Sequence, residues 1–185
     1  MSRSKVLFKL SGSIACYKAC NVISKLVQEG FEVQTACTES ALQFIGPATL
    51  VGLTGKPVFT DGCESGRMLD HIWLAKWADI AVLCPATANS INKIANGIAD
   101  NAIGNLFLAY DLKKPYIVAP AMNSAMLAHP ATAASLEKLK QWGITVLPTG
   151  TGRQACGDIG PGRMLEPDAI FLEIINAINN RENRA

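Results

Sequence analysis

Two long apolar runs constrain the fold of this chain more than any other feature. The segments DIAVLCPA (79–86) and PYIVAPA (115–121) are apolar almost throughout, without alternation of apolar and polar residues. Strands of this kind are typical of parallel sheets, because helices cover both faces of such sheets. The two runs therefore predict central strands of a parallel sheet.

Strand-like and helical patterns alternate along the rest of the chain. Strands are expected at 6–10, 31–37, 79–86, 115–121 and 144–148, and helices at 14–28, 39–45, 48–55, 88–96, 100–110, 130–142 and 167–180. This alternation predicts an α/β fold, a doubly wound sandwich with helices on both faces of the sheet. We expect irregular loops at 61–70 and 154–166, and a disordered tail at 181–185.

The composition is that of a globular chain. It has 185 residues, 49% hydrophobic and 17% charged, and predicts one domain over 1–185. No apolar run approaches the ~20 residues that span a bilayer, and the N-terminus has no signal-peptide pattern, so we expect a cytoplasmic protein. The net charge of +2 does not favour a nucleic-acid partner.

The cysteine pattern argues against a metal site. The six cysteines form no CxxC pair, so neither a zinc site nor a thioredoxin-type site is expected. In a reducing compartment, disulfides are also not expected. Their positions are Cys16, Cys20, Cys37, Cys63, Cys84 and Cys156.

Polar segments follow four of the expected strands: SGS, TES, CPATANS and APAMN. The carboxyl ends of parallel strands meet at one edge of the sheet, where ligands bind. The first segment lacks GxGxxG, which weakens the case for a dinucleotide. A single phosphate needs only a helix N-terminus with a few hydroxyl or amide donors. Although each of these residues could simply cap a helix, together they favour a mononucleotide site.

Two further positions have open interpretations. His71, one of two histidines, precedes a buried strand and is either structural or catalytic, while His129 has a structural interpretation. Cys156 lies in the pliable segment QACGDIGPGRMLE (154–166). That segment is either a surface turn with an incidental cysteine or a mobile lid with a reactive thiol.

Five motifs in order resemble the flavin-dependent cysteine decarboxylases: GSIACYK, HIWLAKWAD, PATANSINKIANGIADN, PAMNSAM and ACGDIGPGRM. They are most similar to the members that act on phosphopantothenoylcysteine in coenzyme A biosynthesis. The resemblance covers nearly the whole chain and implies a flavodoxin-like (Rossmann-like) three-layer α/β/α sandwich. It also implies homotrimers or homododecamers with active sites at subunit contacts, and a ligase domain or protein as a candidate partner.

The resemblance also implies the site residues. FMN would contact Gly12, Ser13, Ile14, Thr38, Ser40, Thr87, Ala88, Asn89, Ser90 and Ala121. His71 would be the catalytic histidine, Asn123 would hold the substrate carboxylate, and Cys156 would be the proton donor. Further substrate contacts are expected from Met126, Ala155 and Gly157, with Lys76 or Arg163 for the substrate phosphate. Leu127 departs from the family pattern, where Trp is frequent after this motif.

The implied chemistry explains the need for these groups. Oxidation of the substrate thiol to a thioaldehyde provides an electron sink, so that carbon dioxide can leave and an enethiolate remains. Hydride return by the flavin and protonation by an acid then complete a redox-neutral cycle. Three alternatives stay open: a peptidyl-cysteine decarboxylase of lantibiotic maturation, a flavin prenyltransferase, and a non-catalytic FMN-binding regulatory subunit.

Overall fold

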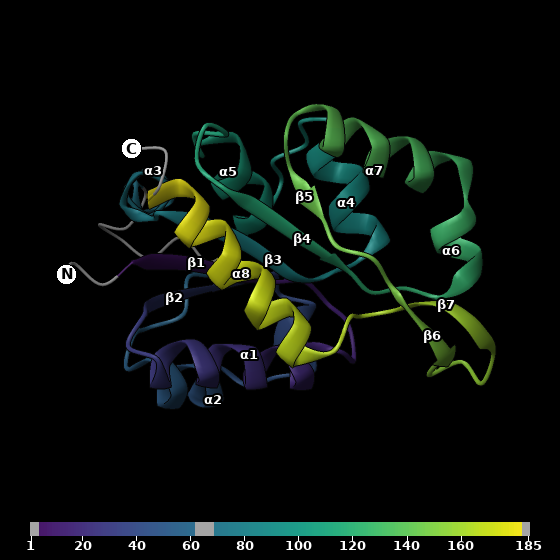
Figure 1. The fold of residues 1–185 in the computed structure, drawn as a ribbon, viewed down its shortest axis with the longest axis horizontal. Helices are drawn as coiled ribbons and strands as arrows, with labels where there is room; N and C mark the ends of the chain where they lie inside the picture. The colour runs from purple at the N-terminus through teal and green to yellow at the C-terminus, as the bar shows by residue number, and fades with distance from the viewer. Residues whose placement is uncertain (1–3, 62–68, 183–185) are drawn as a thin grey trace.

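The computed structural model describes residues 4–61 and 69–182, and its centre is a parallel sheet of five strands (Figure 1). Their order across the sheet is β2 (Glu32–Cys37), β1 (Lys5–Leu10), β3 (Ile80–Ala86), β4 (Tyr116–Pro120) and β5 (Thr145–Val146). The two apolar runs form β3 and β4, which pair in the middle of the sheet. The predicted parallel sheet is confirmed, although β5 is shorter than expected.

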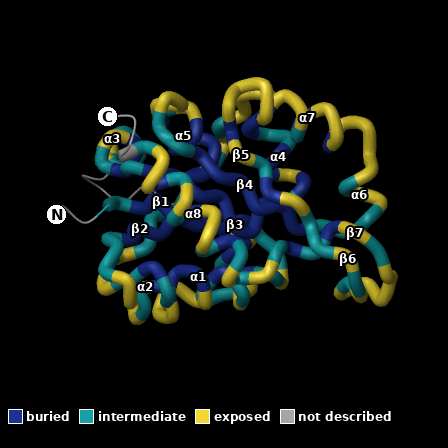
Figure 2. Tube along the Cα trace, in the orientation of Figure 1, coloured by how far each residue is buried: buried dark blue, intermediate teal, exposed yellow. Residues whose placement is uncertain are grey.

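Helices cover both faces of this sheet. One face packs against α1 (Cys16–Gln28), α2 (Pro47–Thr54) and α8 (Pro167–Glu182). The other packs against α3 (Asp70–Trp77), α4 (Ala88–Ala95), α5 (Ala102–Leu108) and α7 (Pro130–Gln141). Figure 2 shows the buried sheet between these exposed layers. The three-layer flavodoxin-like sandwich is thus confirmed.

Several elements differ from the expected ones. Part of segment 154–166 is regular, because β6 (Gly150–Arg153) and β7 (Ile159–Arg163) pair as an antiparallel hairpin. A short helix, α6 (Ser124–Ala128), precedes α7, and the expected helix at 39–45 is a 3₁₀ turn, η1 (Ala41–Gln43). The hairpin strands were missed because they contain four glycines and none of the alternation that predicts a strand.

The expected irregular regions lie partly outside the described residues. These are residues 62–68 of the loop at 61–70, which include Cys63, and residues 183–185 of the tail. Asp70 begins α3, and α8 continues to Glu182, so two residues of the expected tail are helical. The Arg181 guanidinium donates to the Asp79 carboxylate at 2.7 Å, which fastens this end of α8 to the sheet.

A buried lysine occupies the middle of the sheet. Lys9 on β1 is fully buried, and its Nζ donates to the hydroxyl of Tyr116 on β4. The same Nζ lies 4.0 Å from the centroid of the Tyr116 ring. Burial lowers the pKa of Lys9 well below its usual value.

In the part of the chain that the structure describes, no helix combines the length and the apolar character needed to cross a bilayer.

Candidate functional site

The carboxyl ends of β1 and β3 meet where the strand order reverses, and side chains join the loops that follow them. Ser11 Oγ donates to the carbonyl oxygen of Pro85 at 2.8 Å. Ser11 Oγ also accepts from the backbone N–H of Thr87 at 2.9 Å. In open α/β sheets, this switch point is where ligands bind.

Helix α4 begins at this edge with a capped N-terminus. The Thr87 side chain caps the helix by accepting from the Ser90 N–H at 3.3 Å. The first-turn amides of Ala88 and Asn89 have no carbonyl partner within the helix, and the helix dipole favours an anion there. Four of the expected FMN contacts thus surround a helix end that suits a phosphate.

The loop after β2 packs tightly against the loop after β1. Thr38 Oγ1 and Ser40 Oγ are hydrogen-bonded at 3.0 Å. A Cβ atom added to Gly12 would lie 2.5 Å from Ser40 Oγ, so only glycine fits at this position. Gly12, Thr38 and Ser40 therefore share one corner of the edge, as the predicted FMN site requires.

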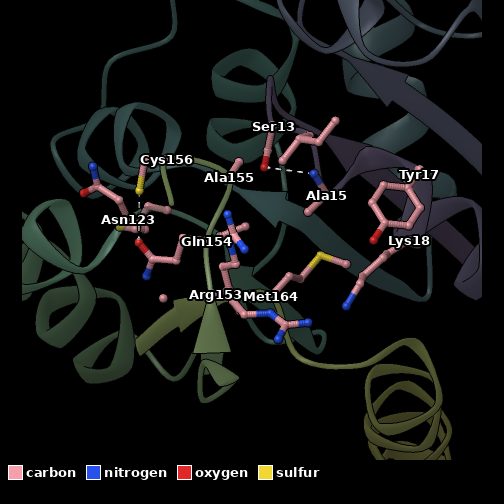
Figure 3. Close-up of a pocket in the computed structure, with 15 residues that line it drawn as sticks. Ser13, Ala15, Tyr17, Lys18, Asn123, Arg153, Gln154, Ala155, Cys156 and Met164 are labelled. Atoms are coloured by element: carbon pink, nitrogen blue, oxygen red, sulfur yellow. Dashed lines mark hydrogen bonds between the residues drawn. The ribbon is translucent and has the colours of Figure 1, made fainter. Parts of the chain in front are cut away.

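A pocket of about 490 Å³ opens beside these loops (Figure 3). Seven expected site residues line it: Ser13, Ile14, Ala121, Asn123, Ala155, Cys156 and Arg163. The start of α1 forms one side, while Gln154 and Cys156 of the hairpin lie beside Asn123 on the other. Segments from three separate parts of the sequence are thus brought together at one site.

Other expected residues do not line this pocket. They are Gly12, Thr38, Ser40, Thr87, Ala88, Asn89, Ser90, Met126 and Gly157, together with His71 and Lys76. The first seven lie in the loops and the helix end that follow β1, β2 and β3. Met126 lies on α6 and Gly157 lies in the turn of the hairpin, so both are close in sequence to residues of the pocket.

His71 and Lys76 lie on α3, which packs against α5 and β1. This helix lies at the opposite end of the molecule from the β6–β7 hairpin (Figure 1). His71 is half-buried, and Lys76 is exposed with its Nζ 5.8 Å from the centroid of the Trp73 ring. The structure therefore does not bring these two residues to the pocket of their own chain.

Two cations of the pocket were not expected from the sequence. Lys18 on α1 and Arg153 on β6 line it together with Arg163. Lys18 Nζ lies 2.7 Å from Glu166 Oε1, and Arg163 Nη2 lies 3.6 Å from the same atom. Lys18 could have been found from its helical spacing of four residues after Ile14, but Arg153 depends on the unexpected hairpin.

The hairpin turn holds Cys156 between two acceptors. Its sulfur lies 3.4 Å from Asp158 Oδ2 and 3.7 Å from Gln154 Oε1. The turn closes with the Gly157 N–H donating to the Gln154 carbonyl at 3.0 Å, and Gly157 has a φ of 97°, which favours glycine. The thiol is thus presented by an ordered turn.

The other described cysteines have a different environment. Cys16, Cys37 and Cys84 are buried and Cys20 is partly buried, whereas Cys156 is exposed. Burial raises the pKa of Cys37 to about 12 and also raises the pKa of Cys16. Among the cysteines of residues 4–61 and 69–182, Cys156 alone is exposed enough to meet a substrate.

Asn123 is the N-cap of α6. Its Oδ1 accepts from the backbone N–H of Met126 at 2.8 Å. This bond orients the carboxamide so that its NH₂ group is the donor available to a carboxylate. The side chain can therefore bind an acid group without contributing a charge.

Comparisons with known proteins find similar proteins that match nearly the whole chain. A model of a family described as Flavoprotein matches residues 1–179. A Streptococcus mutans protein named probable phosphopantothenoylcysteine decarboxylase is 38% identical, and the match covers 92% of this chain and 96% of that protein. A Bacillus subtilis coenzyme A biosynthesis bifunctional protein is 42% identical over 92% of this chain, which spans only 42% of that relative.

A solved structure also matches closely. It is a PPC decarboxylase mutant in complex with pantothenoylaminoethenethiol, with a TM-score of 0.84 and 36% sequence identity. The match covers 93% of this chain and 96% of that one.

Proposed function

Because the chain belongs to the Flavoprotein family, we propose that it catalyses the FMN-dependent decarboxylation of phosphopantothenoylcysteine to phosphopantetheine in coenzyme A biosynthesis. The observation that carries this proposal is the pocket in which Asn123 and Cys156 face the start of α1. An uncharged carboxylate binder and an exposed thiol are the two groups that the later steps of this reaction require.

The residues at the strand ends suit FMN. The capped start of α4 and the hydroxyls of Thr38 and Ser40 would hold the phosphate and ribityl groups. Ala121, which lines the pocket, would contact the ring. A pocket of about 490 Å³ has the size of a small-molecule site. FMN held by these residues would supply the hydride acceptor for oxidation of the substrate and the hydride donor for the final reduction.

Asn123 holds the substrate carboxylate and thereby fixes the α-carbon. A cation at this position would stabilise the ground-state carboxylate more than the transition state for loss of carbon dioxide. The carboxamide avoids this penalty while still orienting the group. We assign this role to its NH₂ group.

Cys156 supplies the proton of the last step. Decarboxylation leaves an enethiolate, whose electron pair forms a C–H bond with the thiol proton at the former α-carbon. A thiol is mostly protonated at neutral pH and can therefore act as this acid. Because Cys156 lines the pocket of its own chain, we propose that the segment 154–166 of each subunit acts on the pocket of that same subunit.

For the substrate phosphate, we propose the cations of the pocket. Lys18 and Arg163 form ion pairs with Glu166, whereas Arg153 also lines the pocket and is more exposed than Arg163. Ala155, Gly157 and Met126 would complete the substrate contacts. Lys76 can contribute only from a neighbouring copy.

We propose that His71 reaches the pocket from a neighbouring copy and assists proton removal as the substrate thiol is oxidised. Trp73, two residues later on α3, is 64% exposed, and Ile14 and Tyr17 at the pocket are each 57% exposed. Large exposed apolar side chains of this kind mark interaction surfaces. Contact between Trp73 of one copy and the Ile14 and Tyr17 side chains of a neighbouring copy would complete the site. Repeated around an axis, this contact would build a homotrimer, with a homododecamer as the higher assembly.

We further propose that residues 1–185 form one decarboxylase domain that acts in the cytoplasm, together with a phosphopantothenoylcysteine ligase as a fused domain or separate protein.

The proposal is tested with the purified holoenzyme and three substrates. Phosphopantothenoylcysteine should release carbon dioxide, whereas a peptide ending in cysteine and dimethylallyl phosphate should not react. Turnover of the peptide alone would favour the lantibiotic-type reaction, and a modified flavin formed with dimethylallyl phosphate would favour a prenyltransferase. Tight FMN binding with no turnover of any substrate would favour a regulatory subunit.

A further inference from the structure

Gln154, two residues before Cys156, makes an unusual set of contacts. Its Nε2 donates to the Pro161 carbonyl at 2.7 Å and to Ser124 Oγ at 2.9 Å. Its Oε1 accepts from the Ser124 backbone N–H at 3.2 Å and from the Cys156 thiol at 3.7 Å. A carboxamide has two N–H donors and two acceptor sites, so this side chain uses its full hydrogen-bonding capacity.

These bonds fasten the hairpin to the start of α6. Ser124 follows Asn123 directly, and its N–H lies in the first turn, where no carbonyl of the helix can accept it. Ser124 Oγ also donates to the Pro161 carbonyl at 2.7 Å. A single oxygen, Gln154 Oε1, therefore links the backbone beside Asn123 to the thiol of Cys156 (Figure 3).

We propose that Gln154 is a positioning residue that sets the Cys156 thiol at a fixed place relative to the Asn123 carboxamide. The inference rests on the proposed function, in which Asn123 fixes the α-carbon and Cys156 protonates it. Proton transfer requires the donor within about 3 Å of its target, and small displacements are costly. A link between the two side chains satisfies this requirement.

The contacts of the thiol agree with this role. Both neighbours of the sulfur, Gln154 Oε1 and Asp158 Oδ2, are acceptors, so the S–H group is the donor toward either one. In the last step the S–H bond breaks, and the electron pair of the enethiolate forms the C–H bond. The resulting thiolate regains its proton from water before the next turnover.

The test compares the holoenzyme with its Gln154→Met variant, which keeps the length of the side chain and loses its hydrogen bonds. Carbon dioxide release should stay within about twofold of the parent, while the yield of reduced product per carbon dioxide falls about tenfold or more and enethiol accumulates. Gln141→Met, the same change at an exposed position on α7, is the matched control and should change neither quantity.

Hydrogen exchange of the same variant provides a readout that does not depend on turnover. In Gln154→Met, the amide of Ser124 should exchange faster, while the sheet exchanges at the parent rate. Unchanged exchange at Ser124, full yield of reduced product, or equal losses of carbon dioxide and product would each overturn the inference. Absence of carbon dioxide release from the parent enzyme would instead overturn the proposed function, and the exchange result would still decide whether Gln154 fastens α6.

Discussion

Cys156 is the residue on which the last step of the proposed reaction depends. Cys156→Ser replaces the thiol with a weaker acid of similar size, so carbon dioxide should still be released while the enethiol accumulates in place of phosphopantetheine. Product mass spectrometry distinguishes the two compounds. Undiminished formation of phosphopantetheine by this variant would refute the role of the thiol, and an unchanged FMN spectrum controls for loss of the cofactor.

Lys9 has a predictable effect on stability. Because burial lowers its pKa, the unfolded state binds more protons than the folded state between the lowered value and the usual 10.5. The free energy of unfolding should therefore rise with pH through that window. Denaturant unfolding from neutral pH to about pH 8 measures this slope, because the tyrosines and cysteines of the unfolded chain stay mostly protonated there. At higher pH the buried cysteines, whose pKa is raised, would give the opposite slope.

The double variant Lys9→Met/Tyr116→Phe serves as the test of that explanation. Replacing both partners with apolar groups should remove the slope and leave the protein at least as stable as the parent at neutral pH. Tyr116→Phe alone should cost about 1–3 kcal/mol, because it leaves the buried amine without its hydroxyl partner. An unchanged slope in the double variant would assign the pH dependence to other groups.

At the scale of elements, the loops after β1 and β2 must approach closely. Gly12→Ala would place a methyl group 2.5 Å from Ser40 Oγ, so we expect a loss of about 1–3 kcal/mol in the free energy of unfolding and weaker FMN binding. Gly52→Ala in α2 is the matched control, since nothing lies within 4 Å of its added Cβ. It should stabilise the protein by about 0.5–1 kcal/mol.

Urea unfolding and flavin fluorescence titration measure these two effects. Equal stability and equal FMN affinity for the two alanine variants would contradict the packing at Gly12.

The central elements could be predicted from the sequence because their signals are local. The runs that form β3 and β4 are apolar throughout. Once the strand ends are predicted, the loops just after them contain the candidate site residues Gly12, Thr38 and Thr87. The β6–β7 hairpin could not be predicted, because its strands are rich in glycine and their pairing joins residues on either side of a turn. Arg153 and Gln154 were missed for the same reason.

At the scale of the whole molecule, the fold of one chain does not bring all residues of the proposed site to one place. His71 lies on α3, whereas Cys156 lines the pocket from the turn between β6 and β7. Helix α3 and this hairpin lie at opposite ends of the molecule (Figure 1). No local pattern could reveal this separation, because it follows from how the whole sheet is wound. The resemblance implied active sites at subunit contacts, which remains a prediction.

Mixed assemblies test that prediction. Each of the variants His71→Asn and Cys156→Ser should fail to make phosphopantetheine alone. Their co-expression should restore part of the activity, because the pocket of a His71→Asn subunit can receive His71 from a Cys156→Ser neighbour. No recovery in assemblies shown to contain both chains would mean that one chain supplies both residues.

The central claim is a redox-neutral decarboxylation that needs no added nicotinamide. The most direct measurement is the mass of the product that the purified FMN-bound protein forms from phosphopantothenoylcysteine. We predict a product that has lost one carbon dioxide and is otherwise unchanged in hydrogen count, namely phosphopantetheine. Recovery of unreacted substrate, or an oxidised product that persists in the parent enzyme, would contradict the account.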